Sequence, residues 1–331
     1  MILYGLCFVL SFLLTWYLTP IMRDAAIRFD IVDRPDGKLK VQREPVPYLG
    51  GLGIYLAFLV TLSLTFSFDR QLLGLLLGGT LALLLGLIDD LGFLSPHVKL
   101  SGQLLAAFVL VKSGIRIEIA LVPDWVTIPL SVLWIVGLTN AFNIIDIMDG
   151  LASGVACICS TALFYVALAN DQGLIAIMAL SLSGALLGFL RYNFEPARIY
   201  LGDAGSLFLG CMIGSLAMIG RYTAENTLGI LAPLVILGVP LFDTAFVSYI
   251  RWRRGMKIFF GSPDHFALRL RKWRLSTRQT VLCSYAASVI LALAGIVMTR
   301  STDLRALAIV AGIGLGAWGL GFLLKKIDMG M

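Results

Sequence analysis

Long apolar runs recur along the whole chain, and polar positions gather in the segments between them. Runs of about 20 apolar residues are typical of helices that cross a bilayer. None of the runs alternates with a period of two, so an outer-membrane barrel is not indicated. We therefore predict an all-α, polytopic membrane helix bundle of about 10–11 transmembrane helices, forming one domain over residues 1–331. The apolar stretches are 2–21, 48–67, 71–88, 101–113, 125–142, 151–169, 173–190, 205–220, 229–250, 280–298 and 305–324.

The composition supports this class. Of the 331 residues, 59% are hydrophobic and 14% are charged, whereas soluble domains are about 45–50% apolar and about 25% charged. These values exclude a soluble globular enzyme, a disordered chain and an ordinary nucleic-acid-binding protein. The five cysteines lie within apolar runs without a metal-binding spacing, and only two histidines occur. A Cys-rich or His-rich metal site is therefore excluded.

Lysine and arginine are distributed unevenly over the two sides of the predicted bundle. The segments after every second run, together with the C-terminus, hold 20 of the 26 Lys and Arg residues, and the other side holds six. Because loops rich in Lys and Arg stay in the cytoplasm, we predict an outside N-terminus and a cytoplasmic C-terminus. The predicted cytoplasmic loops are about 22–47, 89–100, 140–150, 191–204 and 251–279.

Acidic residues occur at the predicted cytoplasmic ends of the helices. Asp89 and Asp90 directly follow an apolar run, and Lys99 comes nine residues later. A charge near the bilayer centre costs roughly 2.5–3.5 kcal/mol on insertion scales, so such residues indicate function. Two adjacent carboxylates are tolerated when a cation lies between them, and Mg²⁺ binds one or two carboxylates together with phosphate oxygens. The alternative interpretation of this pair is a solvated helix end.

The segment 140–150 has the sharpest polar pattern. Asn140, Asn143, Asp146 and Asp149 recur at steps of three residues within an otherwise apolar run. On an α-helix, neighbouring members of this set share a face and form a slanting stripe. Gly150 is then expected to end the helix. The stripe predicts ligand-binding side chains, and its alternative is a polar seam between helices.

A further acid lies between two glycines in the segment 199–206. Asp203 follows Gly202 and directly precedes the eighth apolar run. Glycines let the backbone approach a ligand closely, and a helix N-terminus favours anions. We expect Asp203 to hold a metal that bridges phosphates, with Asn193 close by and the Tyr200 ring available for stacking. A simple helix cap and turn is the alternative.

The last predicted cytoplasmic loop is basic, with nine Lys and Arg residues between 251 and 278. Part of this charge is the usual bias of cytoplasmic loops, and attraction to anionic lipid headgroups is its other use. The loop also contains Asp264 and His265, which follow Pro263 in a compact turn. Asp243, in the preceding run, is interpreted as an interhelical hydrogen-bonding residue.

Carboxylates, a divalent ion and basic groups at a membrane surface are suited to phosphate chemistry. The chain shows neither a Ser-His-Asp nor a Cys-His arrangement. A substrate that never leaves the bilayer explains why such an enzyme needs so many spans. A secondary transporter is the alternative from another class, but transporters place their acids near the midplane within inverted repeats, and no inverted repeat is visible here.

Five blocks, in order, carry a family resemblance. They are 40–51, Asp89-Asp90 with Lys99, 140–150, 201–206 and Asp264-His265. Together they resemble the polyprenyl-phosphate N-acetylhexosamine-1-phosphate transferase superfamily. This superfamily includes phospho-MurNAc-pentapeptide translocase and enzymes that begin the synthesis of cell-surface glycans. The resemblance covers most of the chain.

The resemblance implies that a polyprenyl phosphate attacks a UDP-sugar, giving a polyprenyl-diphosphate sugar and UMP. It implies Mg²⁺ as the cofactor, with Mn²⁺ as an alternative, and a bacterial inner-membrane enzyme that acts at the cytoplasmic face. The partners would be a UDP-N-acetylhexosamine, with GlcNAc as the default sugar, undecaprenyl phosphate and the membrane, without nucleic acid. A homodimer is left open. The implied catalytic residues are Asp89, Asp90, Lys99, Asp146 and Asp149; the metal ligands are Asp203 and Asp149; the substrate-binding residues are Arg43, Asn140, Asn143, Asn193, Tyr200, His265 and Arg269.

One departure from the family pattern concerns the last loop. Family members usually carry several histidines there, whereas this chain has only His265, followed by Phe266, Ala267 and Leu268, with Arg269 as a replacement cation. The departure argues against phospho-MurNAc-pentapeptide as the transferred group. It also leaves open a chain with altered or lost catalysis.

Overall fold

The apolar stretches fall on helices in the computed structural model, which describes residues 1–34, 44–65, 70–119, 122–223, 225–256, 264–327 and 329. Helices account for nearly all of the regular structure in these ranges. They are α1 (Ile2–Arg28), α2 (Gly50–Ser63), α3 (Arg70–Asp90), α4 (Pro96–Lys112), α5 (Asp124–Ile145), α6 (Leu151–Ala169), α7 (Gly173–Asn193), α8 (Gly202–Met218), the 3-10 helix η1 (Thr227–Leu231), α9 (Ala232–Ile236), α10 (Gly238–Arg253), α11 (Phe266–Lys272), α12 (Thr277–Thr299) and α13 (Asp303–Lys325).

Seven of the described helices are long and apolar enough to cross a membrane, or eight if the bent pair at 227–253 counts as one span. This confirms the prediction of an all-α, polytopic membrane protein. The remaining difference from 10–11 spans comes from α2, α4 and α8, which have 14, 17 and 17 residues. These helices are shorter than the about 20 residues that cross the hydrocarbon core, so the higher number stays a prediction.

The stretch 229–250 is not one helix, which corrects the sequence prediction. The segments Thr227–Ile236 and Gly238–Arg253 meet at an angle of 73°. Pro240 lacks the N–H that would bond to the carbonyl of Ile236, so a continuous helix loses a hydrogen bond there. The Cys159 thiol donates to that carbonyl over 3.4 Å. A neighbouring helix therefore stabilises the break.

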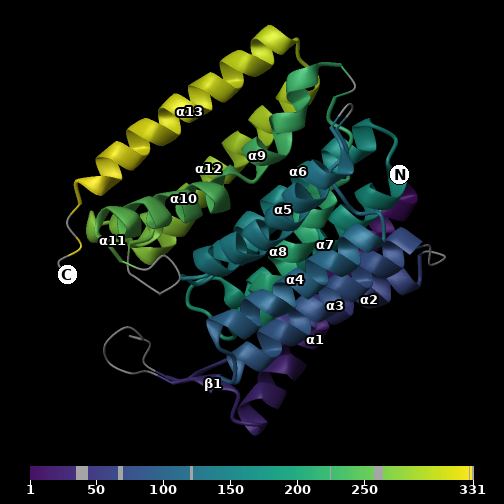
Figure 1. Ribbon diagram of the computed structural model, residues 1–331. Coiled ribbons are helices and arrows are strands. Elements are labelled where there is room, and N and C mark those ends of the chain that lie inside the picture. Colours follow the sequence, from purple (N-terminus) through teal and green to yellow (C-terminus); the bar gives the residue numbers. More distant parts are fainter. Residues whose placement is uncertain are drawn as a thin grey trace.

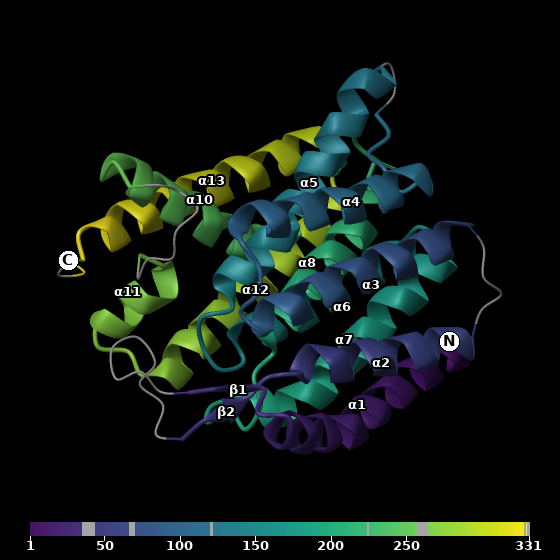
Figure 2. The ribbon, with the colours of Figure 1, turned by 60° about the horizontal axis from the view of Figure 1, so that its bottom comes forward.

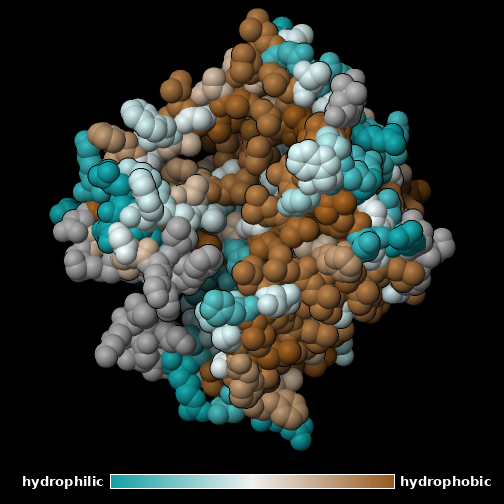
Figure 3. Space-filling model, viewed as in Figure 1, coloured by the Kyte–Doolittle hydropathy of each residue, from teal (hydrophilic) through white to brown (hydrophobic). Residues whose placement is uncertain are grey.

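The helices run side by side, and the two termini lie at opposite ends of the bundle (Figures 1 and 2). Helices α6, α7 and α8 form the buried centre, whereas α13 lies at the edge, with Ala306 and Leu324 as its buried residues. The surface in Figure 3 has a broad apolar belt between hydrophilic margins. Such a belt is expected where lipid surrounds the helices.

A short hairpin lies beside the bundle and is fixed to the start of α8. Strand β1 (Val32–Asp33) pairs antiparallel with β2 (Val46–Pro47). Backbone hydrogen bonds then join the hairpin and the start of α2 to the segment 200–201: Tyr200 donates to the Pro47 carbonyl, while Gly50 and Gly51 donate to those of Tyr200 and Leu201. This attachment positions the turn that carries Asp203.

Candidate active site

A polar cavity of about 610 Å³ lies at the end of α3 that carries Asp89 and Asp90. Its walls come from α3, the segment 146–149, the end of α7, the segment 200–203 and the hairpin. Seven residues that the sequence singled out meet there, together with Asp33 and Tyr48. The lining residues are Asp33, Tyr48, Asp89, Asp90, Asp146, Ile147, Met148, Asp149, Asn193, Tyr200, Leu201, Gly202 and Asp203.

Lys99 joins the carboxylates at the edge of this cavity. Its Nζ lies 2.6 Å from Oδ2 of Asp89 and 2.8 Å from Oδ2 of Asp203, and it donates to Oδ1 of Asn143 over 3.0 Å. Asn143 in turn donates to Oδ1 of Asp203 and to Ser206. Both carboxylate oxygens of Asp203 are thus fixed by donors from two other helices. The structure brings together four predicted site residues in one charged network.

Asp90 holds the start of α8. Its two carboxylate oxygens accept hydrogen bonds from the backbone N–H groups of Asp203 and Ala204, at 2.7 and 3.1 Å. This satisfies two of the donors that a helix N-terminus leaves unpaired. Gly202 has a φ of 73°, and a Cβ there would approach Asp90 Oδ2 to 2.7 Å. Asp90 and Gly202 therefore position Asp203 for its contacts with Lys99 and Asn143.

The polar stripe 140–150 is not helical throughout, which corrects the sequence prediction. Helix α5 ends at Ile145, Asp146 caps it, and Gly150, with a φ of 77°, caps the start of α6. Asp146 and Asp149 therefore reach the cavity from a turn. Burial raises the pKa of Asp146 well above its usual range, and the negative charges of Asp203, Asp90 and Asp149 add to this effect. Burial also raises the pKa of Asp149, which accepts a hydrogen bond from the Ala197 N–H.

We expect Asp146→Asn to increase the thermal stability of the ligand-free protein at pH 8. Because the folded pKa of Asp146 is raised, the folded chain binds more protons than the unfolded chain above the ordinary pKa of about 3.9. The folded protein therefore loses stability as pH rises through the folded pKa and Asp146 becomes charged. Asparagine stays neutral at every pH and avoids this loss. Thermal unfolding in detergent should give a higher midpoint for the variant than for the unchanged protein at pH 8. The difference between the two midpoints should become smaller toward lower pH. Asp24→Asn, an exposed control, should show no gap, and a less stable Asp146→Asn protein at pH 8 would contradict the argument.

Two tyrosines face the cavity from different segments. The rings of Tyr48 and Tyr200 lie 6.1 Å apart with an interplanar angle of 50°. Burial raises the pKa of Tyr200 to about 12, and nearby carboxylates contribute. Burial, followed by a hydrogen bond to Asp33, raises the pKa of Tyr48. Both hydroxyls therefore stay protonated: that of Tyr48 donates to Asp33, and that of Tyr200 can donate to a ligand.

Asn193 supports the turn before Tyr200. It donates to the Ile199 carbonyl over 3.0 Å and accepts from the Ser153 hydroxyl over 2.7 Å. Asn140, in contrast, lies away from the cavity lining and pairs with Gln103 between α4 and α5. The polar-seam alternative thus describes Asn140. Arg43 lies outside the described residues.

His265 and Arg269 belong to a second buried cluster and do not line the cavity. His265 Nδ1 lies 2.7 Å from Oδ2 of Asp243, which matches the interpretation of Asp243 as a hydrogen-bonding residue. The guanidinium of Arg269 bonds to Asp264 and to the carbonyls of Leu324 and Ile327. These contacts fix the last loop and the C-terminal end of α13 together. A substrate-binding role for His265 and Arg269 stays a prediction that gains no support from these contacts.

We expect Arg269→Gln to lower stability much more than it changes catalysis. The Arg269 side chain is 1% exposed and its partner Asp264 is fully buried. Breaking a buried ion pair costs about 3–5 kcal/mol, and Arg254, 3.0 Å from Asp264, compensates in part. We therefore expect a loss near the lower end, about 3 kcal/mol, measured by unfolding in detergent. Arg271→Gln, an exposed change on the same helix, is the control. A raised substrate KM at unchanged stability would instead indicate substrate binding.

The residues of the cavity fit a divalent ion that is shared with a phosphate ligand. Within the described ranges, no three His, Cys, Asp or Glu side chains are grouped to hold a metal ion by themselves. Mg²⁺, however, uses one or two carboxylates and completes its shell with water and phosphate oxygens. Asp89, Asp149 and Asp203, which all line the cavity, offer such oxygens. The donor set therefore suits a metal that binds together with substrate.

The fold and the cavity define a multi-pass membrane protein with an acidic site suited to phosphorylated ligands. The comparisons make this class specific. The family model for glycosyl transferase family 4 matches residues 72–221. Over 92% of its length, the chain is 36% identical to a probable undecaprenyl-phosphate N-acetylglucosaminyl 1-phosphate transferase of Bacillus subtilis, covering 87% of that protein.

Other relatives have related names. The chain is 30% identical to a decaprenyl-phosphate N-acetylglucosaminephosphotransferase of Mycolicibacterium smegmatis, over 92% of this chain and 84% of that protein. It is 32% identical to a phospho-N-acetylmuramoyl-pentapeptide-transferase of Halalkalibacterium halodurans, over 81% of this chain and 89% of that protein. The chain belongs to this family of membrane-bound polyprenyl-phosphate sugar-phosphate transferases. It is an enzyme whose lipid substrate is a polyprenyl phosphate.

Proposed function

We propose that the enzyme transfers GlcNAc 1-phosphate from UDP-GlcNAc to undecaprenyl phosphate in the presence of Mg²⁺. The products are a polyprenyl-diphosphate sugar and UMP. The observation that carries this proposal is the cavity at the end of α3, where Lys99 lies within hydrogen-bond distance of both Asp89 and Asp203. This arrangement offers anionic oxygens for a metal and an ammonium group for a phosphate.

In the reaction, an oxygen of the lipid phosphate forms a bond to the β-phosphorus of UDP-GlcNAc. The bond between that phosphorus and the bridging oxygen breaks, and the electron pair leaves on UMP. The lipid phosphate has a second pKa of about 6 and is largely ionised at neutral pH, so its attack needs positioning more than a strong base. Asp89 and Lys99 provide this positioning, because they reach the cavity edge from α3 and α4.

Charge neutralisation is the other requirement. Mg²⁺, held by Asp203 with Asp149 nearby, would supply a positive charge to the diphosphate. Lys99 adds a second positive charge beside Asp203. Tyr200, whose ring borders the cavity, stacks on uracil, and the neighbouring Tyr48 ring limits the space beside it. The nucleotide is thus oriented with its diphosphate toward the carboxylates.

The sugar assignment rests on the relatives that carry GlcNAc in their names and on the single histidine of the last loop. The second candidate is phospho-MurNAc-pentapeptide transfer, which the name of the Halalkalibacterium halodurans relative supports. We assign the enzyme to the bacterial inner membrane with its cavity on the cytoplasmic side, because the charge bias places the loops around Asp89, Asp149 and Asp203 inside. The charge bias likewise places the N-terminus outside.

The donor test uses purified protein in nanodiscs that contain undecaprenyl phosphate. UDP-GlcNAc, UDP-GalNAc and UDP-MurNAc-pentapeptide are supplied in turn with Mg²⁺, and released UMP is measured. We expect UMP from UDP-GlcNAc, none without the lipid phosphate, and none when EDTA replaces Mg²⁺. UMP from the pentapeptide donor alone would favour the second candidate. No UMP from any donor would refute both.

A further inference from the structure

A second cavity of about 610 Å³ lies at the opposite end of α3, where α4 ends and α5 begins. Asp90 and Arg70 are the two ends of a 21-residue helix, so the two cavities are separated by about 30 Å along that helix. Because α3 and α5 qualify as membrane spans, the second cavity lies at the level of the lipid headgroups on the other side. The residues that line it are Arg70, Gln71, Phe108, Val111, Lys112, Ser113, Gly114, Arg116, Glu118, Ile128 and Val132.

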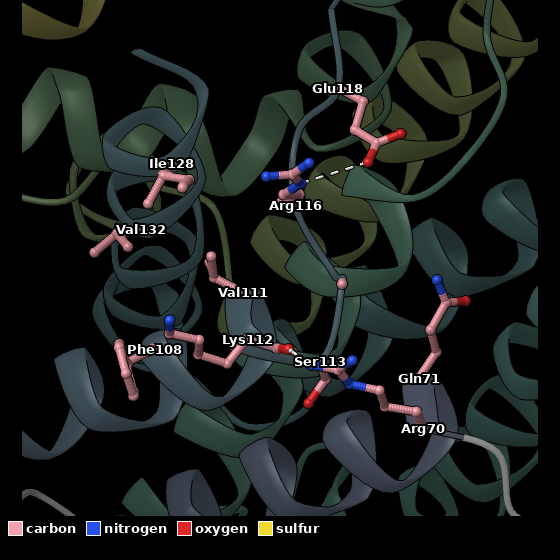
Figure 4. A pocket seen from close by; sticks show the side chains of 11 residues that line it. Arg70, Gln71, Phe108, Val111, Lys112, Ser113, Arg116, Glu118, Ile128 and Val132 are labelled. Atoms are coloured by element: carbon pink, nitrogen blue, oxygen red, sulfur yellow. Dashed lines mark hydrogen bonds and ion pairs between the residues drawn. The ribbon is translucent and has the colours of Figure 1, made fainter. Parts of the chain in front are cut away.

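Figure 4 shows Phe108, Ile128 and Val132 on one side of this cavity and Arg70 and Gln71 on the other. Phe108 and Ile128, which belong to α4 and α5, are 55% and 36% exposed. Arg70 borders the opposite part, whereas the Lys112 side chain extends toward Phe108, and Arg116 lies near Glu118. Such a division suits a molecule with a charged head and an apolar tail.

Among the described residues, not all of these basic groups are paired with a carboxylate. Arg116 pairs with Asp124 at 2.8 Å and with Glu118 at 3.4 Å, so its charge is balanced. In the part of the chain that the structure describes, no carboxylate lies within ion-pair distance of Arg70 or Lys112. Lys112 Nζ instead lies 5.6 Å from the centroid of the Phe108 ring. Among the described residues, Arg70 and Lys112 therefore border the cavity without a carboxylate partner, and the charge of Lys112 lies beside an apolar ring.

The loop that closes the cavity is built into the fold. Gly114 has a φ of 91° and donates to the Val111 carbonyl, while Ile115 is fully buried and donates to that of Leu110. The Ile117 N–H then bonds to the hydroxyl of Ser131 on α5. Arg70 Nη2 donates to the carbonyl of Lys112 over 2.7 Å, which joins α3 to the end of α4. The backbone that carries the basic residues, and the Arg70 side chain, are thus fixed before a ligand arrives.

From these contacts, we propose that this cavity binds an anionic glycerophospholipid, with its phosphate at the Lys112 ammonium, with Arg70 adding positive charge from the opposite side, and with an acyl chain along Phe108 and Ile128. A soluble anion would use the basic groups but not the apolar wall, and a zwitterionic lipid would leave one positive charge uncompensated. Polar groups and acyl chains meet at this depth of the bilayer, so the geometry favours a lipid. The site is separate from the transferase cavity and does not depend on the function assigned to it.

The test measures phosphatidylglycerol retained by delipidated protein in nanodiscs of phosphatidylcholine, by native mass spectrometry. Each basic residue near a membrane surface contributes about 1 kcal/mol to the attraction of anionic lipid. For Arg70→Gln/Lys112→Gln we expect about thirty-fold weaker retention, which corresponds to about 2 kcal/mol. The matched control is Arg221→Gln/Arg305→Gln, which removes two exposed charges elsewhere and should retain lipid like the unchanged protein.

Lys112→Gln alone addresses folding, because the Lys112 side chain makes no hydrogen bond to the described fold, whereas Arg70 supports the end of α4. This variant should keep the unfolding midpoint in phosphatidylcholine and still bind phosphatidylglycerol several-fold more weakly. Equal retention by the double variant and its control would overturn the proposal. So would equal binding of phosphatidylcholine, or displacement of the lipid by inorganic phosphate or glycerol phosphate, which would identify a soluble-anion site.

Discussion

Replacing Asp203 with asparagine is expected to lower kcat by at least about a thousand-fold, a loss of about 4 kcal/mol of transition-state stabilisation. Asp203 accepts hydrogen bonds from Asn143 on one oxygen and from Lys99 on the other. The asparagine amide group must face one of these two donors, so one contact becomes a donor–donor clash. The substitution also removes the carboxylate that we assign to Mg²⁺, which loses affinity with its anionic ligand. UMP release at saturating UDP-GlcNAc measures the effect.

The controls for Asp203→Asn separate chemistry from folding. Asp264→Asn makes the same change at a fully buried carboxylate that pairs with Arg269 and lies outside the cavity lining. It should lower stability but leave kcat per folded molecule within a few-fold, and Asp264→Ala should likewise cost less activity than any change at Asp203. A raised Mg²⁺ requirement in the Asp203 variant would support the metal assignment. Full activity of that variant would remove it.

The carboxylates of the site could be predicted from the sequence because the bilayer makes charge expensive. Acids at the ends of apolar runs are conspicuous, and Asp89, Asp90, Asp146, Asp149 and Asp203 line the same cavity. The membrane spans were predictable for the same physical reason, since a run of about 20 apolar residues is typical of a helix that crosses the bilayer. The hydropathy pattern thus predicted the helices, and the acidic residues that interrupt it predicted most of the site.

The other features depend on tertiary contacts that no local pattern encodes. Asp33 and Tyr48 reach the cavity because a hairpin is bonded to the segment 200–201, and Asp33 has no distinctive neighbours in the sequence. In the sequence, Asn140 has the pattern of a ligand-binding residue. The structure shows instead that it pairs with Gln103 on α4. The helix break near Pro240 had a local signal, but a single proline within an apolar run predicts a kink without its angle.

Lys99→Gln is expected to lower kcat by roughly a hundred-fold or more, the range found when one charge-stabilising donor is removed. The Lys99 ammonium contacts Asp89, Asp203 and Asn143. The described residues that line the cavity include no Lys or Arg, so Lys99, at the cavity edge, supplies the positive charge that contacts these carboxylates. Glutamine therefore leaves two carboxylates facing each other and removes the positive charge near the diphosphate. Lys99→Arg keeps the charge and should recover part of the loss, whereas His97→Gln, an exposed change in the first turn of the same helix, should have no effect.

A double-mutant cycle distinguishes the two ways in which Lys99 can act. If Lys99 works by neutralising and orienting Asp89, then Asp89→Asn should remove most of the additional effect of Lys99→Gln, and the two losses in kcat/KM will be far from additive. If Lys99 instead contacts the diphosphate directly, the losses will add. The 2.6 Å separation between Lys99 Nζ and Asp89 Oδ2 favours strong coupling. Additive losses would therefore place Lys99 on the substrate and separate its role from that of Asp89.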